Sequence, residues 1–219
     1  MTTKQRTKEY KKLMKRKNEI GIGIIGMGAR GVHNLGVQSA ALCKDTGFRL
    51  AAVCDRNPLR MRETAEYLRG EFAKQGVDVS PNLHQEAADL IADPAVDMIV
   101  ITSPTYCHRE HALLALESGK KVYCDKPLAQ NAEDSAAIVD AEAKTDNPLI
   151  MGFTRRYEAP WLKAYSLLKE GVIGDLTMIQ VRNIIPYWHY LTAWWRKREW
   201  SGGALNDKGA HLFDVFRVC

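Results

Sequence analysis

The sequence predicts an α/β fold, with a doubly wound parallel sheet followed by the start of an α+β domain. Short apolar runs alternate with helix-like segments of ten or more residues as far as residue 153, and this alternation is typical of parallel strands joined by helices. Beyond that point the alternation stops, and a helical segment leads into one stretch of alternating apolar residues. We therefore expect a tail over 1–19, a doubly wound domain over 20–153 and a partial second domain over 154–219.

The elements of the first domain follow from its apolar runs. The first predicted strand, Ile20–Ile25, enters a glycine-rich turn and then a helix that reaches about Cys43. The remaining expected elements are strands over 48–55, 98–104, 120–127 and 148–153, and helices over 57–74, 108–119 and 131–145, the last with Asn131 as its N-cap.

The second domain begins with a predicted helix over 158–169 and a turn over 171–174. The sequence LTMIQVRNI, residues 176–184, predicts a half-buried strand because its apolar residues alternate. The aromatic and basic stretch from Pro186 to Trp200 is expected to form a packed or substrate-facing lid rather than a nucleic-acid platform. A last helix over 204–216 is expected, with its buried side formed by Leu205, Leu212, Phe213 and Phe216.

Composition narrows the class of protein. The 219 residues are 46% hydrophobic and 26% charged, which is ordinary for a globular protein. The net charge of +5 is concentrated in the tail, where we expect a solvated helix and no nucleic-acid or membrane partner. The five cysteines are odd in number and form no CxxC pair, so we expect unpaired thiols in a reducing cytoplasm and no metal site.

A glycine motif follows the first strand and opens a helix. It comprises Gly26, Met27, Gly28, Ala29, Arg30 and Gly31. In this GxGxxG pattern the first glycine permits a tight turn, the second lets backbone amides approach a pyrophosphate, and the third lets the helix lie against the strand. The motif therefore predicts a Rossmann nucleotide-binding domain, the alternative being three turn glycines without a ligand.

Asp55, at the end of the second strand, favours NAD over NADP. A carboxylate there accepts hydrogen bonds from the adenosine ribose and repels a 2′-phosphate. Arg56 beside it keeps NADP open as an alternative. A strand-terminal aspartate that only caps the next helix is the structural alternative.

More residues gather at the carboxyl ends of the third and fourth strands, the edge where such sheets bind ligands. We expect Thr102, Ser103, Pro104 and His108 to line the cofactor, although His108 alone fits a helix-terminal or surface histidine equally well. Asp125 and Lys126 are expected at the same edge, where Pro127 keeps Lys126 out of helical geometry. As a pair they also fit a solvated salt bridge.

Asp207 and His211 would lie one turn apart on one face of the last predicted helix, where they can converge with Lys126. Polyol oxidation needs a base for the hydroxyl proton and a cation near the developing alkoxide. His211 would be the base, Lys126 the cation and Asp207 an acceptor for a substrate hydroxyl. A helix-surface ion pair is the alternative for Asp207 and His211.

The series GMGARG, the strand-end aspartate, TSPTYCH, CDKP and SGGALNDKGAHLFD resembles the glucose-fructose oxidoreductase and inositol dehydrogenase (Gfo/Idh/MocA) family over about residues 20–219. The resemblance implies that Lys126, Asp207 and His211 form the catalytic set. It also implies a nicotinamide cofactor, sugar or cyclitol substrates, and a homo-oligomer if the full substrate domain is present. Asp125 stands where the family usually has glutamate, a change that keeps the charge.

Members of that family continue well past this last helix, so the resemblance implies that only part of the substrate domain is present, with 176–184 left as an exposed strand. The expected function is an NAD-dependent dehydrogenase of a sugar or cyclitol secondary alcohol. The alternatives are a non-catalytic nucleotide-binding regulator or truncated relative, and an NAD-assisted glycoside hydrolase.

Overall fold

A computed structural model describes residues 19–184 and 193–219, without the side chains of Ala193 and Trp195. The chain divides into two compact units. The N-terminal unit runs to Ser103 and includes Glu110–Cys124 and Val139–Ile150, and the second unit comprises Pro104–Arg109, Asp125–Ile138 and Met151–Cys219. The basic tail and the first half of the predicted aromatic lid, including Trp188 and His189, lie outside the described residues.

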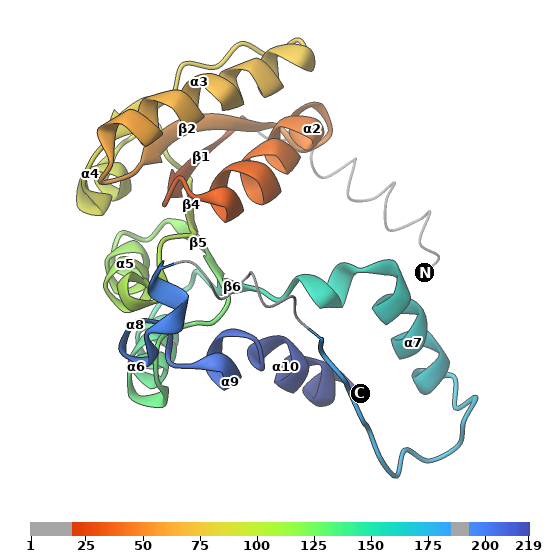
Figure 1. Ribbon diagram of the computed structural model, residues 1–219. Coiled ribbons are helices and arrows are strands. Elements are labelled where there is room, and N and C mark those ends of the chain that lie inside the picture. The colour runs from red at the N-terminus through yellow and green to blue at the C-terminus, as the bar shows by residue number, and fades with distance from the viewer. Residues whose placement is uncertain (1–18, 185–192) are drawn as a thin grey trace. The chain divides into compact units, whose positions relative to one another are not determined.

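A six-stranded sheet in the order β3-β2-β1-β4-β5-β6 organises the fold (Figure 1). Its strands are β1 Ile20–Ile25, β2 Phe48–Cys54, β3 Asn82–His84, β4 Met98–Ile101, β5 Lys121–Asp125 and β6 Leu149–Gly152. β1 pairs in parallel with β2 and β4, β2 with β3, and β4 with β5. This is the strand order of the Rossmann fold, in which ligands bind where the order reverses beside β1.

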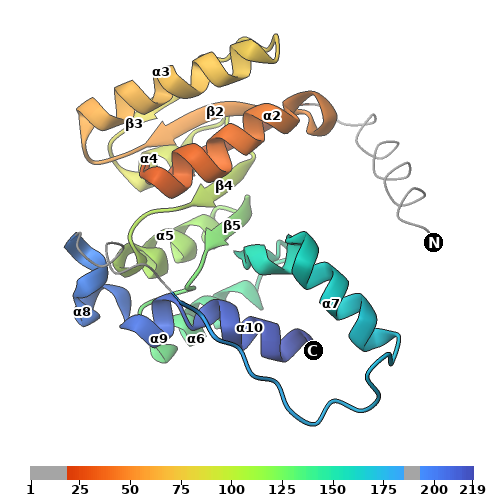
Figure 2. The same ribbon diagram turned by 45° about the vertical axis from the view of Figure 1, so that its right-hand side comes forward.

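Helices cover both faces of the sheet in the N-terminal unit (Figure 2). α2 Val37–Thr46, which continues a π-helical turn over Arg30–Gly36, and α3 Pro58–Lys74 share one buried cluster with Ile22 and Leu50. On the other face α4 Ala87–Ala92 lies so close that a Cβ on Gly23 would be 2.8 Å from Leu90. The predicted doubly wound arrangement is therefore confirmed.

The predicted elements of the first domain are confirmed, although the third strand ends at Ile101, before the predicted 104. The two later helices are α5 Thr105–Glu117 and α6 Ala132–Glu142. Asn131 caps α6 by accepting a hydrogen bond from the Asp134 amide at 2.8 Å. β3 and α4 were not predicted, because three residues, Asn-Leu-His, give no apolar run that could signal a strand.

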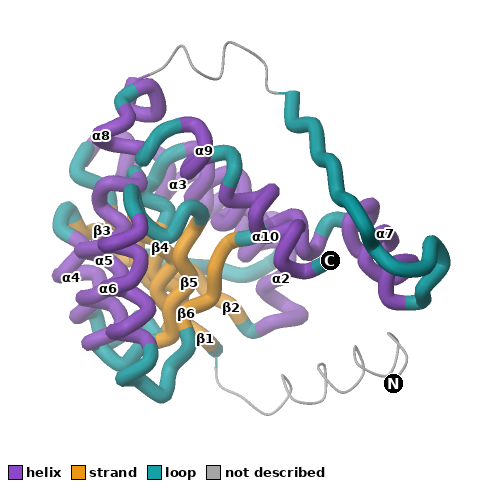
Figure 3. The backbone as a smooth tube through the Cα atoms, turned by 90° about the horizontal axis from the view of Figure 1, so that it is seen from below, coloured by secondary structure: helices purple, strands orange, loops and turns teal. Residues whose placement is uncertain are grey.

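In the second unit, η2 Thr154–Tyr157 and α7 Ala159–Lys169 agree with the predicted helix. The predicted strand over 176–184 is wrong: the segment is extended chain without ladder pairing, and Met178 is 80% exposed (the loop that follows α7 in Figure 3). Alternation describes which side chains could share a face, but a strand forms only when a neighbouring strand accepts its backbone hydrogen bonds.

The single helix predicted over 204–216 is also wrong. After η4 Ala193–Arg196 and α8 Arg198–Ser201, the chain forms α9 Ala204–Asp207 and α10 Ala210–Val218. The break falls at Gly209, where a Cβ would lie 2.2 Å from the carbonyl oxygen of Leu205. Only glycine allows so close a backbone approach.

The side chains that are buried in this region also differ from the prediction. Leu205, Phe213 and Phe216, predicted to be buried, are 76%, 60% and 40% exposed, and Leu212 is half-buried. Asp207 and Asp214 are buried instead. The buried side of this region therefore carries two carboxylates that were not among the residues predicted to be buried. None of the described helices is long and apolar enough to cross a membrane.

A buried carboxylate holds β3 at the edge of the sheet. Asp93, directly after α4, accepts hydrogen bonds from Asn82 Nδ2 at 2.8 Å, His84 Nε2 at 2.9 Å and the Ala95 amide at 2.8 Å. Burial alone would raise the pKa of Asp93, but these hydrogen bonds outweigh it and lower the pKa to about 2. The ionised carboxylate is thus the form that the fold stabilises.

Asp93→Asn should lower the free energy of unfolding of the N-terminal unit by about 2 kcal/mol at pH 7. A depressed carboxyl pKa stabilises the fold above the ordinary value near 4, and this contribution disappears as the pH falls toward 2. The variant should therefore show a smaller loss of stability between pH 4 and 2 than the unchanged protein. Hydrogen exchange of the β2 and β3 amides over that range measures the difference, and parallel pH profiles would contradict it.

Candidate functional site

The glycine turn after β1 is held by close backbone packing. Gly26 has φ +95°, and a Cβ there would lie 2.5 Å from the Ser103 amide nitrogen. A Cβ on Gly31 would lie 2.3 Å from the Gly26 carbonyl oxygen. The first and third glycines of the motif are therefore needed by the protein itself, as the turn and the helix contact require.

Gly28 differs, because a Cβ there would meet no protein atom within 4 Å. Gly28 and Ala29 are exposed, whereas Met27 is buried. The packing of the protein thus gives no reason for a glycine at position 28, and the open space in front of it fits the approach of a pyrophosphate to the backbone. The residues of this turn fit a dinucleotide.

Asp55 organises the same turn. Its Oδ2 accepts a hydrogen bond from the Met27 amide at 3.0 Å, and its Oδ1 accepts from the Asn57 amide at 2.8 Å and from Arg60 at 3.0 Å. A carboxylate offers about four acceptor positions, so these three bonds leave capacity for a ribose hydroxyl. The sequence did not predict the bond to Met27, which ties the strand-end acid to the glycine motif. Arg56 is exposed.

Thr102 and Ser103, at the end of β4, make contacts within the protein. The Thr102 hydroxyl donates to the carbonyl oxygens of Ile25 at 3.0 Å and Gly26 at 2.8 Å, so it holds the backbone where the glycine turn begins. Ser103 Oγ lies 2.9 Å from His111 Nδ1, and both side chains are buried. Their predicted role as cofactor contacts stays a prediction, and these contacts show that they also support the turn.

In the second unit, His108 supports the loop that carries Lys126. It is 2% exposed, and its Nδ1 donates a hydrogen bond to the Pro127 carbonyl oxygen at 2.8 Å. His108 is therefore not the surface histidine offered as one interpretation of the sequence. Pro104 is half-buried and Asp125 is buried.

Lys126 and Asp207 meet directly. Lys126 Nζ donates to the Asp207 carbonyl oxygen at 2.6 Å and to its Oδ1 at 3.0 Å. The two side chains are only 13% and 8% exposed, so Lys126 forms a largely buried ion pair with Asp207, whereas the solvated salt bridge that the sequence left open paired it with Asp125. Lys208 Nζ lies 3.1 Å from Asp207 Oδ2, and the sequence did not predict this contact.

The two lysines set the charge of Asp207. Burial raises the pKa of its carboxyl group, but the charges of Lys126 and Lys208 and their hydrogen bonds outweigh this and lower the pKa below its ordinary value. Asp207 is therefore ionised at neutral pH, and Lys126 is held at two points beside it.

His211 lies in the first turn of α10. Its ring packs against Phe153 in an edge-to-face arrangement, with centroids 6.5 Å apart. One turn later, the buried Asp214 forms an ion pair with Arg156, which also lies over the Phe153 ring. These contacts fix the part of α10 that carries the histidine. The broken helix places Asp207 and His211 on successive short helices rather than on one.

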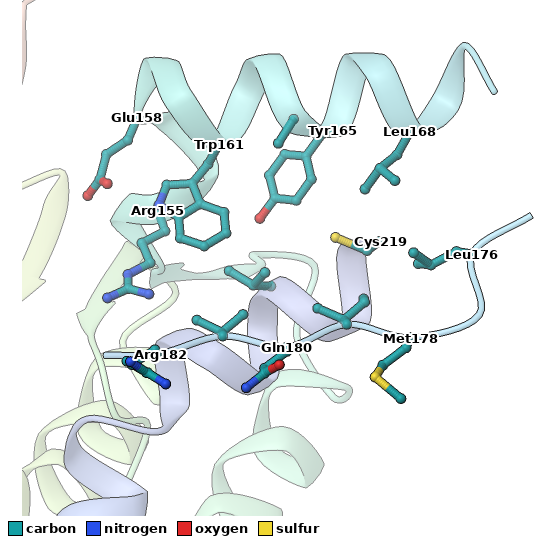
Figure 4. Close-up of a pocket in the computed structure, with 14 residues that line it drawn as sticks. Arg155, Glu158, Trp161, Tyr165, Leu168, Leu176, Met178, Gln180, Arg182 and Cys219 are labelled. Carbon is teal, nitrogen blue, oxygen red and sulfur yellow. The ribbon is translucent and has the colours of Figure 1, made fainter. Parts of the chain in front are cut away.

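A separate pocket of about 610 Å³ lies within the second unit, between α7, the extended segment and the end of α10 (Figure 4). It is lined by apolar side chains such as Trp161 and Leu168, with Arg155 and Arg182 at one end. The Tyr165 hydroxyl is buried in its wall. None of Lys126, Asp207 and His211 lines this pocket.

Comparison with known proteins identifies both parts of the chain. Residues 20–153 match the Gfo/Idh/MocA oxidoreductase family with its NAD-binding Rossmann fold, and residues 165–218 match the C-terminal alpha/beta domain of the same family. An inositol 2-dehydrogenase of Gluconacetobacter diazotrophicus is 37% identical over 90% of this chain and 53% of its own length. An inositol 2-dehydrogenase/D-chiro-inositol 3-dehydrogenase of Shouchella clausii is 31% identical over 90% of this chain and 51% of its own length.

Among solved structures, the myo-inositol dehydrogenase of Lactobacillus casei in complex with NAD(H) and myo-inositol is similar, with a TM-score of 0.60 and 28% identity. The match covers 71% of this chain and 43% of that one. The chain thus spans about half the length of the curated relatives that it matches. The glycine turn, the strand order and both family matches agree, and the chain belongs to the Gfo/Idh/MocA oxidoreductase family.

Proposed function

We propose that the protein is an NAD-dependent oxidoreductase that transfers a hydride between the nicotinamide and a secondary alcohol of a cyclitol or sugar. The observation that carries this proposal is the buried pair of Lys126 and Asp207, in a chain whose N-terminal part is an NAD-binding Rossmann domain. The inositol dehydrogenases among its relatives support a cyclitol as the substrate.

Each of the three residues has a distinct role in the proposed reaction. The bound nicotinamide supplies the hydride acceptor. A ring nitrogen of His211 takes the proton of the substrate hydroxyl, and the Lys126 ammonium group stabilises the negative charge that develops on that oxygen. Asp207 holds Lys126 through its carbonyl oxygen and Oδ1, and its remaining acceptor positions bind a neighbouring hydroxyl of the substrate.

The proposal is tested by incubating the chain with NAD and a panel of inositols, sugars and sugar alcohols while NADH absorbance is followed. We expect steady NADH formation with at least one cyclitol or sugar. Calorimetric NAD binding with no turnover of any compound would favour the nucleotide-binding regulator. Release of a sugar from a glycoside without net NADH would favour the NAD-assisted hydrolase.

Asp55→Asn should weaken NADH binding by about tenfold and leave NADPH binding unchanged or stronger. The amide keeps an oxygen acceptor and the shape of the side chain, but it loses the charge that repels a 2′-phosphate. Calorimetric titration with both nucleotides measures the change in their ratio. Because Asp55 also binds Arg60, Arg60→Gln is the control for loss of that contact alone. An equal loss for both nucleotides would contradict a role of Asp55 in selecting NADH.

A further inference from the structure

Asn206 lies directly before Asp207, and its side chain crosses to the loop that follows Lys126. Its Nδ2 donates to the carbonyl oxygens of Ala129 at 2.8 Å, Gln130 at 3.2 Å and Ser201 at 3.0 Å. Three carbonyl acceptors around one amide nitrogen fix the orientation of the amide, because an oxygen in that place would face only acceptors.

The contact of Asn206 with the loop requires a glycine at position 202. A Cβ on Gly202 would lie 2.1 Å from the Gln130 carbonyl oxygen and 2.3 Å from Asn206 Nδ2. The Gln130 side chain in turn donates to the Glu199 carbonyl oxygen. Gly202 is therefore closely packed against the Gln130 backbone and the Asn206 side chain, with no space for a side chain at position 202.

We propose that Asn206 is a positioning residue that holds Lys126 in place for catalysis. Two contacts join the loop after Lys126 to the 201–207 segment. The Asn206 side chain bonds to the carbonyl oxygens of residues 129 and 130, and the Lys126 side chain bonds to Asp207. One of the two acceptors of Lys126 is the Asp207 carbonyl oxygen, a backbone atom of the residue next to Asn206. The position of that atom depends on the backbone, so the Asn206 contacts set where the ammonium group lies.

Only the catalytic consequence of this inference rests on the proposed function, because the protection of the Lys126 amine can be measured without turnover. Lys126 is largely buried, so its acylation by an amine-reactive ester should be slow in the unchanged protein. Asn206→Asp places a carboxylate oxygen against three carbonyl oxygens. We expect it to speed acylation of Lys126 by about tenfold relative to Lys197, which is exposed, as measured by mass spectrometry.

Two glycine variants provide a matched pair. Gly202 and Gly203 both have positive φ, 77° and 90°, so alanine strains the backbone at either position. A Cβ on Gly203, however, meets nothing closer than Arg198 Cγ at 3.6 Å. Gly202→Ala should therefore expose Lys126 as Asn206→Asp does, and Gly203→Ala should change its acylation by less than about twofold. Asn183→Asp, at an exposed site, controls for the added charge.

In an active protein, Asn206→Asp should also lower kcat by about tenfold or more and leave the KM for NAD unchanged. A general loss of structure would instead change both kcat and this KM. Unchanged protection of Lys126 in folded Asn206→Asp and Gly202→Ala would overturn the inference. If Asn206→Asp does not fold, Asn206→Ala replaces it, because alanine removes the hydrogen-bond donors without adding charge. The acylation rate of Lys126 relative to Lys197 then tests the inference. Faster acylation in a chain without dehydrogenase activity would refute the proposed function and leave the positioning role standing.

Discussion

In the proposed reaction, Lys126→Met should lower kcat by about 10³-fold and leave NADH affinity unchanged. Methionine keeps much of the length of the side chain but has no charge and no donor. The alkoxide that develops during oxidation would then lose its nearest cation in a site where Lys126 is only 13% exposed. Charge stabilisation is strong at such a buried position because solvent screens it weakly.

Lys126→Met should also change the pKa of Asp207. Its carboxylate would keep Lys208 on Oδ2 but lose Lys126 from Oδ1, so the pKa of Asp207 should rise toward its ordinary value. Carboxyl carbon NMR of the variant and the unchanged protein measures this rise without any need for turnover. Lys163→Met, on the exposed side of α7, is the control for loss of one positive charge. A fall in kcat of less than tenfold would contradict the role given to Lys126.

The Rossmann half could be predicted from the sequence because its signals are local. Ile20–Ile25 is an apolar run, Gly26 needs its positive φ, and Asp55 ends the next strand. β3 could not be predicted in this way, since its three residues become a strand only through pairing with Ala52, Val53 and Cys54 of β2. Short edge strands are determined by their neighbours more than by their own composition.

The errors in the second unit have the same origin. The alternation of 176–184 gives a correct preference for extended chain, but the pairing that would make it a strand depends on another segment. The periodicity of 204–216 predicts a helix and misses the close approach of Gly209 to the Leu205 carbonyl oxygen. Both features depend on contacts outside the sequence window that generates the pattern.

Some residues of the candidate site could likewise be predicted from the sequence and others could not. Lys126 and Asp207 were paired by a motif and by resemblance to a family, and the structure brings them into contact. Lys208 and Asn206 carry no signal of their own, because a lysine and an asparagine beside an aspartate are common in any sequence. The contacts of Asn206 become visible only once the loop after Lys126 lies against α9, whereas Lys208 contacts the carboxylate of its own sequence neighbour.

Gly28→Val should weaken NADH binding by about 100-fold with little change in stability. A Cβ at this position meets no protein atom within 4 Å, so the side chain starts in open space in the free protein. When the dinucleotide is bound, the same side chain would occupy the space in which the pyrophosphate approaches the backbone. The variant thus separates binding from folding, which most changes in a glycine motif do not.

Two further glycine variants make this separation measurable. Gly26→Ala forces a φ of +95° on a residue with a Cβ and brings that Cβ to 2.5 Å from the Ser103 amide nitrogen, so it should destabilise the N-terminal unit by about 2 kcal/mol or more. Gly70→Val, in α3, also adds a side chain into open space and should leave NADH binding unchanged. Calorimetric titration with NADH and thermal unfolding of Gly28→Val, Gly26→Ala and Gly70→Val distinguish a loss of binding from a loss of stability. Normal NADH affinity in Gly28→Val would show that the open space beside this glycine is not where the cofactor binds, and the nucleotide site would have to be sought elsewhere on the sheet edge.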